Sequence, residues 1–306
     1  MGQQLIALDW GTSSFRGYLM SSDGDIRDSF ANGRGILHCD EQGFEGVLEE
    51  SAGKWMDRYA QAPLIASGMI SSRQGWVEAP YLNCPAGLTE FSRQLISLDL
   101  KRGRKIWFVP GAMYRSESNI PDVMRGEETQ ILGRVGRQQK RFSFVMPGTH
   151  SKWVVVEDGK LSWFTTFMTG ELYAILLNHS ILGRLMEDGP HDDQAFREGL
   201  VAAKQADRKG KGVMNLLFSV RSRGLFKEIA VTGLKAYLSG ILIGAEVAEA
   251  SREMTADVDV QLIGDRQLIQ FYQEALRFFG WSSEPLFEDL AAHGLLNIAK
   301  SAGMIG

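Results

Sequence analysis

Short apolar runs, each closed by turn residues, follow one another along the first part of the chain. The runs are Gln4–Asp9, Phe15–Met20 and Ile26–Phe30, and the residues between them include Gly11–Ser14 and Asp23-Gly24. Runs of this length that end in glycine, aspartate or serine are typical of β-strands, and an Asp-Gly pair favours a tight hairpin. The pattern therefore predicts three strands joined by short turns.

Helical and strand patterns then alternate. Apolar spacing predicts helices over Phe44–Tyr59 and Val123–Val135, and strands are predicted over Pro63–Ser67 and Lys105–Val109. The second half is mostly helical. Its predicted elements are helices over Gly170–Met186, Asp192–Lys204, Val213–Arg221, Thr232–Ala250, Asp265–Phe279 and Glu288–Lys300 and a strand over Val258–Ile263. Such alternation is typical of α/β domains.

The opening pattern recurs near the middle of the chain. Strand-like runs at Phe142–Met146 and Lys152–Val156 flank the tetrapeptide Gly148-Thr149-His150-Ser151, as the first two runs flank Gly11-Thr12-Ser13-Ser14. A Gly-Thr-x-Ser match alone arises readily by chance. Because the flanking strands also match and the offset is near half the chain, the repeat favours a duplicated core.

The repeat and the length of 306 residues together predict two α/β lobes with a cleft between them. We expect an N-terminal lobe of residues 1–138 and a C-terminal lobe of residues 139–306, with Gln138–Arg141 as the crossover. The closing helix, residues 288–301, is placed where it can pack back on the N-terminal lobe. The sequence leaves room for a homo-oligomer.

Composition and charge argue against several classes of binding partner. With 33 Lys and Arg against 37 Asp and Glu, the net charge of −4 argues against a general nucleic-acid binder. The longest apolar stretch, Ala236–Ala248, is shorter than the about 20 residues that a membrane span needs. Two cysteines, Cys39 and Cys84, offer neither a disulfide framework nor a cysteine zinc site. We therefore expect a cytoplasmic protein that binds neither nucleic acid nor membrane.

The first Gly-Thr turn combines a carboxylate with several hydrogen-bond donors. Asp9 stands at the C-terminal end of a strand, and Gly11 lets the backbone approach a ligand closely. Thr12 and Ser13 add hydroxyl and amide donors. Such a turn can cradle phosphate oxygens while the aspartate holds a metal directly or through water. The alternative is a polar hairpin turn without a ligand.

The second Gly-Thr turn lacks the carboxylate. Gly148, Thr149, His150 and Ser151 offer donors, whereas Met146 stands where Asp9 stands in the first copy. If both turns hold one nucleotide, the metal rests mainly on Asp9. His150 has a second interpretation as a capping residue.

Adjacent carboxylates, Glu127 and Glu128, stand at a predicted helix start just before the second turn. On a helix, neighbouring side chains point about 100° apart, so only one of the two is expected to face a cleft. A carboxylate there can accept a hydroxyl proton as a general base. The alternative is a structural role, because the helix dipole favours acidic residues in the first turn.

Longer segments carry a resemblance to a known family. The segments are LDWGTSSFR, SGMISSRQGW, APYLNCPAG, VMRGEETQILG, VMPGTHSKWV, FMTGELYAILLNHSILG and LSGILIGAEV. In this order they resemble the signature segments of the 2-dehydro-3-deoxygalactonokinase family, in the sugar kinase/actin/heat-shock-protein ATPase superfamily. The resemblance covers nearly the whole chain. It implies an α/β fold of two duplicated ribonuclease-H-like lobes with the active site in the cleft.

The resemblance also implies an activity and a set of site residues. The family phosphorylates the terminal (6-) hydroxyl of 2-dehydro-3-deoxy-D-galactonate with ATP and Mg²⁺, in galactonate catabolism. By similarity Asp9 is the metal and catalytic carboxylate, and Glu128 is preferred over Glu127 as the base. The implied phosphate donors are Gly11, Thr12, Ser13, Gly148, Thr149, His150 and Ser151. Gly264 and Asp265 are implied beside the adenosine, in the C-terminal lobe.

The sugar acid is assigned mainly to the N-terminal lobe by the same resemblance. Its candidate contacts are Ser71, Ser72, Arg73, Trp76, Thr169 and Glu171. Arg73 is the nearest candidate cation for the substrate carboxylate. Because the superfamily usually has an aspartate in the second phosphate motif, Pro147 or Met146 departs from the pattern and leaves the second metal contact unassigned.

Two other functions fit parts of the sequence. A phosphohydrolase would use Glu128 to activate water, and the RGEE segment resembles the acidic segment of exopolyphosphatases. A sensor of sugar acids or nucleotides would bind without catalysis, although it would not need to keep both Asp9 and Glu128. Sugar-dependent ADP release, as opposed to sugar-independent phosphate release, separates a kinase from a phosphohydrolase.

Overall fold

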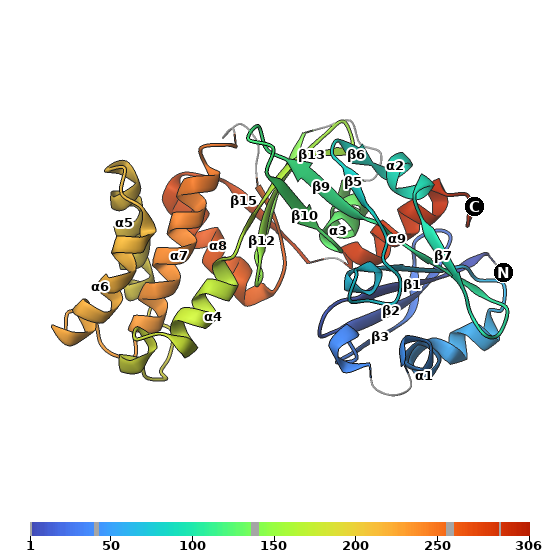
Figure 1. Cartoon of the computed structure of the whole chain (residues 1–306), viewed down its shortest axis with the longest axis horizontal. Coiled ribbons are helices and arrows are strands. Elements are labelled where there is room, and N and C mark those ends of the chain that lie inside the picture. Colours follow the sequence, from blue (N-terminus) through green and yellow to red (C-terminus); the bar gives the residue numbers. More distant parts are fainter. Residues whose placement is uncertain (1, 40–42, 136–140, 255–259, 288) are drawn as a thin grey trace. The chain divides into compact units, whose positions relative to one another are not determined.

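The computed structural model describes residues 2–39, 43–135, 141–254, 260–287 and 289–306. The chain forms two compact units (Figure 1). The first unit comprises Met1–Arg141, Val155–Phe164 and Glu288–Gly306, and the second comprises Phe142–Val154 and Thr165–Phe287. Apart from Arg141, the crossover predicted at Gln138–Arg141 lies outside the described residues, as does the predicted lobe boundary.

The first unit is built on a six-stranded sheet in the order β3-β2-β1-β4-β8-β7. Its strands are β1 (Gln4–Trp10), β2 (Phe15–Ser21), β3 (Ile26–Asn32), β4 (Leu64–Ser67), β7 (Ile96–Asp99) and β8 (Lys105–Phe108). Strands β1, β2 and β3 are antiparallel neighbours, whereas β4 runs parallel to both β1 and β8. The five strands predicted for this sheet are thus confirmed, whereas its strand β7 was not predicted.

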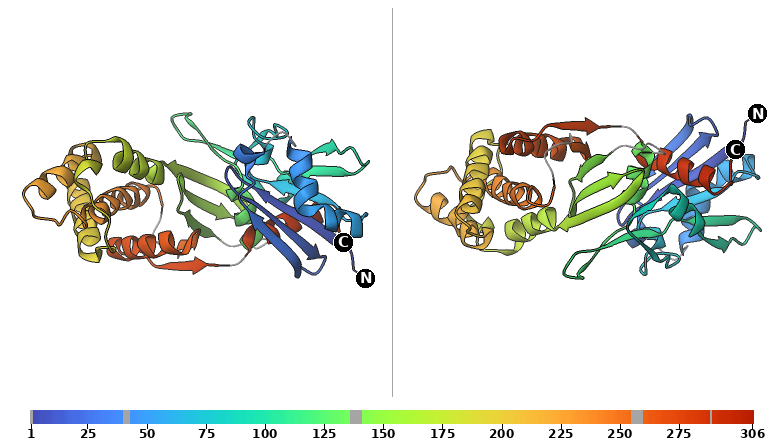
Figure 2. Two further views of the ribbon diagram at one scale, coloured as in Figure 1. Left: turned by 90° about the horizontal axis from the view of Figure 1, so that it is seen from below. Right: turned by 90° about the horizontal axis from the view of Figure 1, so that it is seen from above.

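Helices cover both faces of this sheet. The helices of the first unit are η1 (Ile36–His38), α1 (Gly43–Arg58), η2 (Met69–Ser71), α2 (Leu88–Arg93), α3 (Glu127–Val135) and α9 (Leu290–Ser301). Alternate residues of β1, namely Ile6, Leu8 and Trp10, share one fully buried core with residues of α1. On the other face α9 packs against β1, β2 and β4, and both views of Figure 2 show this red helix along the blue strands.

Glycines let α9 approach α3 closely. A Cβ atom added at Gly294 would lie 1.8 Å from the Thr129 carbonyl oxygen, and one at Gly133 would lie 2.1 Å from that of Leu290. No side chain fits at such separations. This contact places the start of α3, with its two glutamates, against the helix that covers β1.

The helix predicted over Val123–Val135 is wrong in its first turn. Pro121–Met124 form strand β10, which pairs antiparallel with β9 (Gly111–Arg115), and β5 (Tyr81–Asn83) completes a three-stranded sheet. Helix α3 begins only at Glu127, after Gly126 with a φ of 109°. A left-handed glycine interrupts helical hydrogen bonding, so the apolar spacing before it belongs to a strand.

A second six-stranded sheet has the order β15-β14-β11-β12-β13-β6. Its strands are β6 (Ala86–Gly87), β11 (Phe142–Met146), β12 (Ser151–Glu157), β13 (Lys160–Phe167), β14 (Val260–Ile263) and β15 (Ser283–Leu286). The order β13-β12-β11-β14-β15 repeats β3-β2-β1-β4-β8, with β14 parallel to β11 and β15 as β4 is to β1 and β8. This repeat of topology supports the predicted duplication. The division between the two units falls within β12 and β13.

Six helices are described in the second unit. They are α4 (Thr169–His179), η3 (Gly183–Leu185), α5 (Asp193–Arg208), α6 (Val213–Leu225), α7 (Leu234–Ala250) and α8 (Arg266–Phe279). The predicted helices are confirmed, except that the one over Gly170–Met186 stops at His179. Helices α5 and α7 pack closely, because Gly199 and Gly240 have no room for a Cβ atom.

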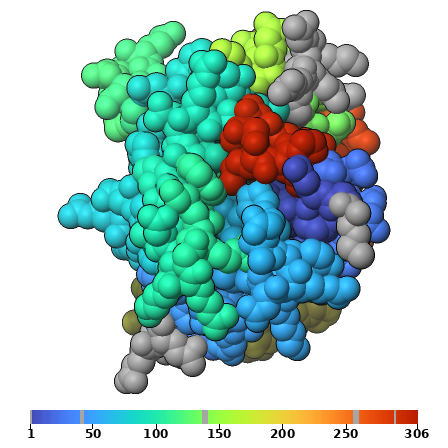
Figure 3. Space-filling view, turned by 90° about the vertical axis from the view of Figure 1, so that its right-hand side faces the viewer, coloured from blue at the N-terminus to red at the C-terminus, as the bar shows by residue number. Residues whose placement is uncertain are grey.

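The chain ends meet on the first unit. The Gly306 amide donates to the Gln3 side-chain carbonyl at 2.7 Å, and Figure 3 shows the red C-terminal segment beside the dark blue N-terminal residues. Among the described residues, no helix is both long enough and apolar enough to cross a membrane.

Candidate functional site

Asp9 lies near the end of β1, where it pairs with Ser67 of the parallel strand β4. The neighbouring residues Leu8 and Trp10 point into the core, so the Asp9 side chain projects from the opposite face. Burial raises the pKa of Asp9, the Arg16 guanidinium at 3.9 Å opposes that rise, and the negative charge of Glu127 adds to it. Asp9 therefore lies close to the predicted acidic pair.

The first Gly-Thr turn is held in place by backbone hydrogen bonds, and two of its residues are exposed. The Gly11 amide donates to the Ser14 carbonyl at 2.9 Å, and the amides of Ile36 and Leu37 donate to the carbonyls of Gly11 and Thr12. Thr12 itself is exposed, as is the next residue, Ser13. Their hydroxyl groups are therefore accessible to a ligand, and phosphate binding at this turn stays a prediction.

The acidic pair begins α3 in two different environments. Glu128 is fully buried and accepts hydrogen bonds from the Gly126 amide at 2.7 Å and the Thr129 hydroxyl at 3.0 Å. Burial raises the pKa of Glu128 to about 8, and the charge of Glu127 adds to the rise. Glu127 is half-buried and accepts from the Arg125 amide at 3.0 Å. A carboxyl group with a pKa near neutrality suits a general base.

Two glycines bring Asp9 and the acidic turn together. A Cβ atom added at Gly68, the residue after β4, would lie 3.5 Å from the Asp9 carboxylate and 2.8 Å from the Trp10 carbonyl oxygen. One added at Gly126 would lie 3.3 Å from the Gly68 Cα. The end of β1, the end of β4 and the start of α3 thus form one acidic cluster within the first unit.

The predicted sugar-acid residues of the first unit lie in the loop after β4. Ser71 is fully buried, and its hydroxyl lies within hydrogen-bond distance of the carbonyls of Gly68 and Val109. Trp76 stacks on Phe44 with ring centroids 6.0 Å apart. Both side chains support the loop. Ser72 is buried as well, whereas Arg73 is exposed and free to meet a ligand.

Arg125 joins this loop to the acidic turn. Its Nη1 donates to the Ser71 hydroxyl at 2.9 Å, its Nη2 donates to the Ala79 carbonyl at 2.8 Å, and its guanidinium lies 4.3 Å from the Tyr81 ring centroid. The sequence pattern drew attention to the two glutamates beside it and not to this arginine. A buried arginine is rare without specific partners, so the burial of Arg125 indicates a specific role. In the sequence, its position next to the acidic pair is the feature that could have indicated this role.

The second Gly-Thr turn packs against the start of α4. The Glu171 amide donates to the Thr149 carbonyl at 3.0 Å, and the His150 and Glu171 side chains are 2.5 Å apart. A Cβ atom at Gly170 would lie 2.4 Å from the Gly148 carbonyl oxygen. Thr169 and Glu171, which were predicted to contact the sugar acid, therefore lie beside the residues that were predicted to bind phosphate.

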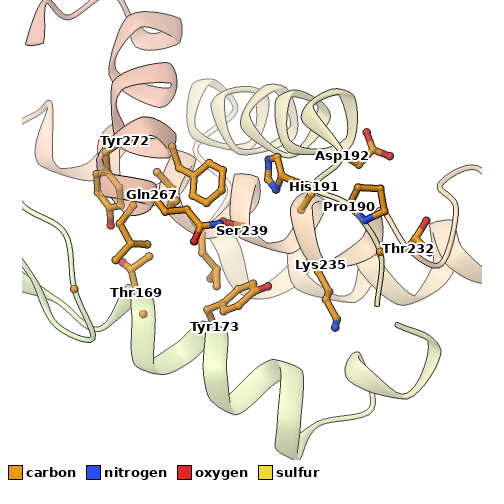
Figure 4. Close-up of a pocket in the computed structure, with 18 residues that line it drawn as sticks. Thr169, Tyr173, Pro190, His191, Asp192, Thr232, Lys235, Ser239, Gln267 and Tyr272 are labelled. Atoms are coloured by element: carbon orange, nitrogen blue, oxygen red, sulfur yellow. The ribbon is translucent and has the colours of Figure 1, made fainter. Parts of the chain in front are cut away.

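A cavity of about 330 Å³ opens next to this turn, within the second unit (Figure 4). Its walls come from α4, α7, α8 and the segment that precedes α5. Its lining includes Gly148, Thr169, Tyr173, Pro190, His191, Asp192, Lys235, Ser239, Gln267, Phe271 and Tyr272. A concave site with apolar walls and a few polar groups is typical of small-molecule binding.

The residues predicted for adenosine lie just before the cavity-lining part of α8. The Asp265 carboxylate caps α8 and accepts from the Gln267 amide at 2.9 Å and the Leu268 amide at 3.3 Å. Gly264 lies against Pro147, since an added Cβ atom would be 3.2 Å from its carbonyl oxygen. Neither residue is among those that line the cavity. Their place beside the adenosine stays a prediction, and the sequence analysis did not identify the cavity-lining side chains of α8, which begin at Gln267.

His191 was missed as well. Its ring and that of Phe271 both line the cavity, with their centroids 4.5 Å apart and their ring planes tilted by 32° to each other. The segment before α5 has no repetitive pattern, so no periodic signal points to His191.

Comparisons with known proteins agree along the whole chain. The family model for 2-keto-3-deoxy-galactonokinase matches residues 9–298. A candidate 2-dehydro-3-deoxygalactonokinase from Rhizobium meliloti (strain 1021) is 35% identical over 97% of this chain and 96% of its own length. The 2-dehydro-3-deoxygalactonokinase from Escherichia coli (strain K12) is 32% identical over 98% of this chain and 99% of its own length.

Solved structures extend the comparison to the fold. The crystal structure of a candidate 2-dehydro-3-deoxygalactonokinase from Sinorhizobium meliloti matches with a TM-score of 0.87 and 35% identity, covering 97% of this chain and 98% of that one. The activator of the 2-hydroxyisocaproyl-CoA dehydratase from Clostridium difficile matches with a TM-score of 0.51 and 12% identity, covering 98% and 96%. The second match concerns the fold alone.

Proposed function

The chain belongs to the 2-keto-3-deoxy-galactonokinase family, and from that premise we propose that it transfers the γ-phosphoryl group of ATP to the terminal (6-) hydroxyl of 2-dehydro-3-deoxy-D-galactonate. The observation that carries the proposal is the acidic cluster of the first unit. There Asp9, which lies between two core residues of β1, is near Glu127 and Glu128 at the start of α3. A kinase of this kind needs one carboxylate near the phosphates and one near the accepting hydroxyl.

Phosphoryl transfer asks the protein mainly to position the reactants and to neutralise charge. The exposed hydroxyls of Thr12 and Ser13 and the donors of Gly148–Ser151 bind phosphate oxygens in this proposal. Asp9 would hold Mg²⁺, directly or through water. A single carboxylate fits Mg²⁺, which keeps most of its waters and takes further ligands from phosphates. When bound, the ion neutralises negative charge on the phosphates.

Glu128 acts as the general base in this proposal. Its carboxylate accepts the proton of the terminal hydroxyl as the oxygen attacks phosphorus. The hydrogen bonds from the Gly126 amide and the Thr129 hydroxyl hold the carboxylate in one orientation. Glu127, the more exposed of the two, is the alternative base, and the paired variants discussed below distinguish them.

The cavity of the second unit is the proposed site of the adenosine. His191 and Phe271 offer aromatic surface to a purine, and Gln267 and Ser239 offer polar groups. Gly148 lines the cavity and also belongs to the second Gly-Thr turn, so a nucleotide seated there has its phosphates next to the turn. In the first unit, the exposed Arg73 is the proposed partner of the sugar-acid carboxylate.

A coupled assay of ADP release tests the proposal over a panel of 2-keto-3-deoxy sugar acids. We expect ADP release that depends on the sugar acid and is fastest with 2-dehydro-3-deoxy-D-galactonate. Release of inorganic phosphate at the same rate with and without sugar acid would indicate a phosphohydrolase instead. Binding of sugar acid without turnover would indicate a sensor.

A further inference from the structure

A buried carboxylate lies beneath the cavity of the second unit. Glu246, on α7, is only 3% exposed. Its carboxylate accepts from the Trp153 indole N–H at 2.7 Å and from the Tyr272 hydroxyl at 2.6 Å. Trp153 belongs to β12 and Tyr272 to α8, so one side chain links three elements of the unit.

The groups around Glu246 donate their hydrogen bonds toward its carboxylate. The Tyr272 hydroxyl has a single proton, which it donates to Glu246, so it accepts from the Ser151 hydroxyl at 2.8 Å. The Thr169 side chain lies beside Glu246 and Tyr272, where it opposes the rise in the pKa of each. The resulting network passes from Ser151 through Tyr272 to the carboxylate.

This network joins the second Gly-Thr turn to the cavity. Ser151 is the last residue of the turn, and Thr169 is the first residue of α4, whose next residues pack on the turn. Thr169 and Tyr272 also line the cavity, and Figure 4 shows them together at the end opposite Asp192 and Thr232. The hydroxyls of Ser151 and Tyr272 thus connect the turn to the cavity wall.

A carboxylate in this place is costly for folding. Burial raises the pKa of Glu246, which means that the surroundings disfavour its charge. Apolar residues of similar size usually stabilise such a position as well or better. A fully hydrogen-bonded polar network, in contrast, holds its members in one geometry. We therefore attribute this cost in folding free energy to the need to hold the second Gly-Thr turn in one geometry.

We propose that Glu246 is a positioning residue that acts through Tyr272 and Ser151 to hold the second Gly-Thr turn where the phosphates of a nucleotide in the cavity reach it. The inference rests on the proposed function, because it takes the cavity as the adenosine site. It goes beyond that function by assigning part of the affinity for the phosphates to Glu246 and Tyr272, which are not among the proposed phosphate-binding residues.

The test compares AMP with ADP. A network that positions the phosphate turn contributes to the added affinity for the second phosphate and little to adenosine binding, whereas a merely structural role affects both nucleotides equally. Tyr272→Phe removes the central hydroxyl, and Glu246→Gln removes the charge that orients it. Tyr237→Phe is the matched control. Tyr237 is also a buried tyrosine, on the same helix as Glu246, and its hydroxyl bonds to Ser219 at 3.0 Å away from the cavity lining.

Affinities are measured by calorimetry on the full-length chain with AMP and with ADP in the presence of Mg²⁺. We expect Tyr272→Phe and Glu246→Gln to weaken ADP binding by about ten- to a hundredfold, as expected for one lost hydrogen bond with a charged partner, and AMP binding by less than about twofold. The control should bind both as the wild type does.

Equal losses for AMP and ADP in the variants, or the same loss of ADP affinity in the control, would overturn the inference. If Glu246→Gln does not fold, Tyr272→Phe carries the test, since it keeps the ring that fills the core. A wild-type chain that binds neither nucleotide would refute the proposed function, which is a different outcome from a failure of the network.

Discussion

Replacing Glu128 with glutamine should slow turnover while nucleotide binding persists. The change keeps the size of the side chain and allows the hydrogen bond from the Gly126 amide to remain. It removes the group that accepts the hydroxyl proton. Because that interaction forms only as the hydroxyl loses its proton, kcat should fall more than the KM for ATP rises. General bases contribute about 10²- to 10⁴-fold, so the loss should lie in this range.

The pH dependence of the wild type follows from the same residue. Burial raises the pKa of Glu128 to about 8, so at pH 7 only about one tenth of the molecules carry the ionised base. The rate constant kcat/KM for the sugar acid should therefore rise about tenfold per pH unit up to pH 7 and level off above pH 8. In Glu128→Gln this rise should disappear.

Glu127→Gln is the control because it changes the neighbouring, half-buried carboxylate. It should cost less than about tenfold in kcat and should leave the rise with pH in place, moved slightly toward lower pH because a nearby negative charge is removed. Coupled ADP release from pH 5.5 to 9 measures all three proteins. If the two variants exchange these results, Glu127 is the base. If neither slows turnover by tenfold, the acidic pair is a structural feature of the helix start and the reasoning is refuted.

Three further outcomes follow from the same structure. Asp9→Asn should lower kcat by at least about 10²-fold at saturating Mg²⁺ in a folded chain, and more than a tenth of the wild-type rate would contradict its role. Glu128→Gln should also stabilise the fold at alkaline pH, because the raised pKa of Glu128 means that the folded state favours its neutral form. The stability of the wild type should fall by up to about 5 kcal/mol as the pH rises from the ordinary pKa of 4.5 to about 8. Thermal unfolding should show an advantage of the variant that grows over this range of pH. Gly294→Ala should destabilise by at least about 2 kcal/mol because of the contact with Thr129, whereas Gly53→Ala, where an added Cβ atom meets nothing within 4 Å, should stabilise by up to about 1 kcal/mol; equal shifts in urea unfolding would contradict the close packing of α3 on α9.

Much of the fold was predictable because local patterns and tertiary structure agree. Strands such as Gln4–Asp9 and Phe142–Met146 are apolar runs closed by turn residues, and both occupy the same place in equivalent sheets. The prediction failed at the start of Val123–Val135, where the apolar spacing fits both the period of a helix and that of a strand. The left-handed Gly126 decided between them, and its conformation is a property of the folded turn.

For the candidate site, the sequence identified residues whose roles stay predictions. Motifs identified Asp9, the acidic pair and both Gly-Thr turns, because glycine and carboxylate spacing is visible in one segment of sequence. The cavity wall was not visible. His191 and Tyr272 reach it from separate segments, and Glu246 lies in a run that reads as an apolar helix. Such residues meet only through tertiary packing, so a single sequence carries no signal for them.

The position of the transferred phosphate tests the central claim most directly. The wild-type chain is incubated with ATP, Mg²⁺ and 2-dehydro-3-deoxy-D-galactonate, and the products are analysed by phosphorus NMR. We expect one ADP for each sugar acid consumed, and a phosphate monoester whose signal is split by the two protons of the terminal carbon. Inorganic phosphate as the only new phosphorus product beside ADP, or a phosphate on another carbon, would contradict it.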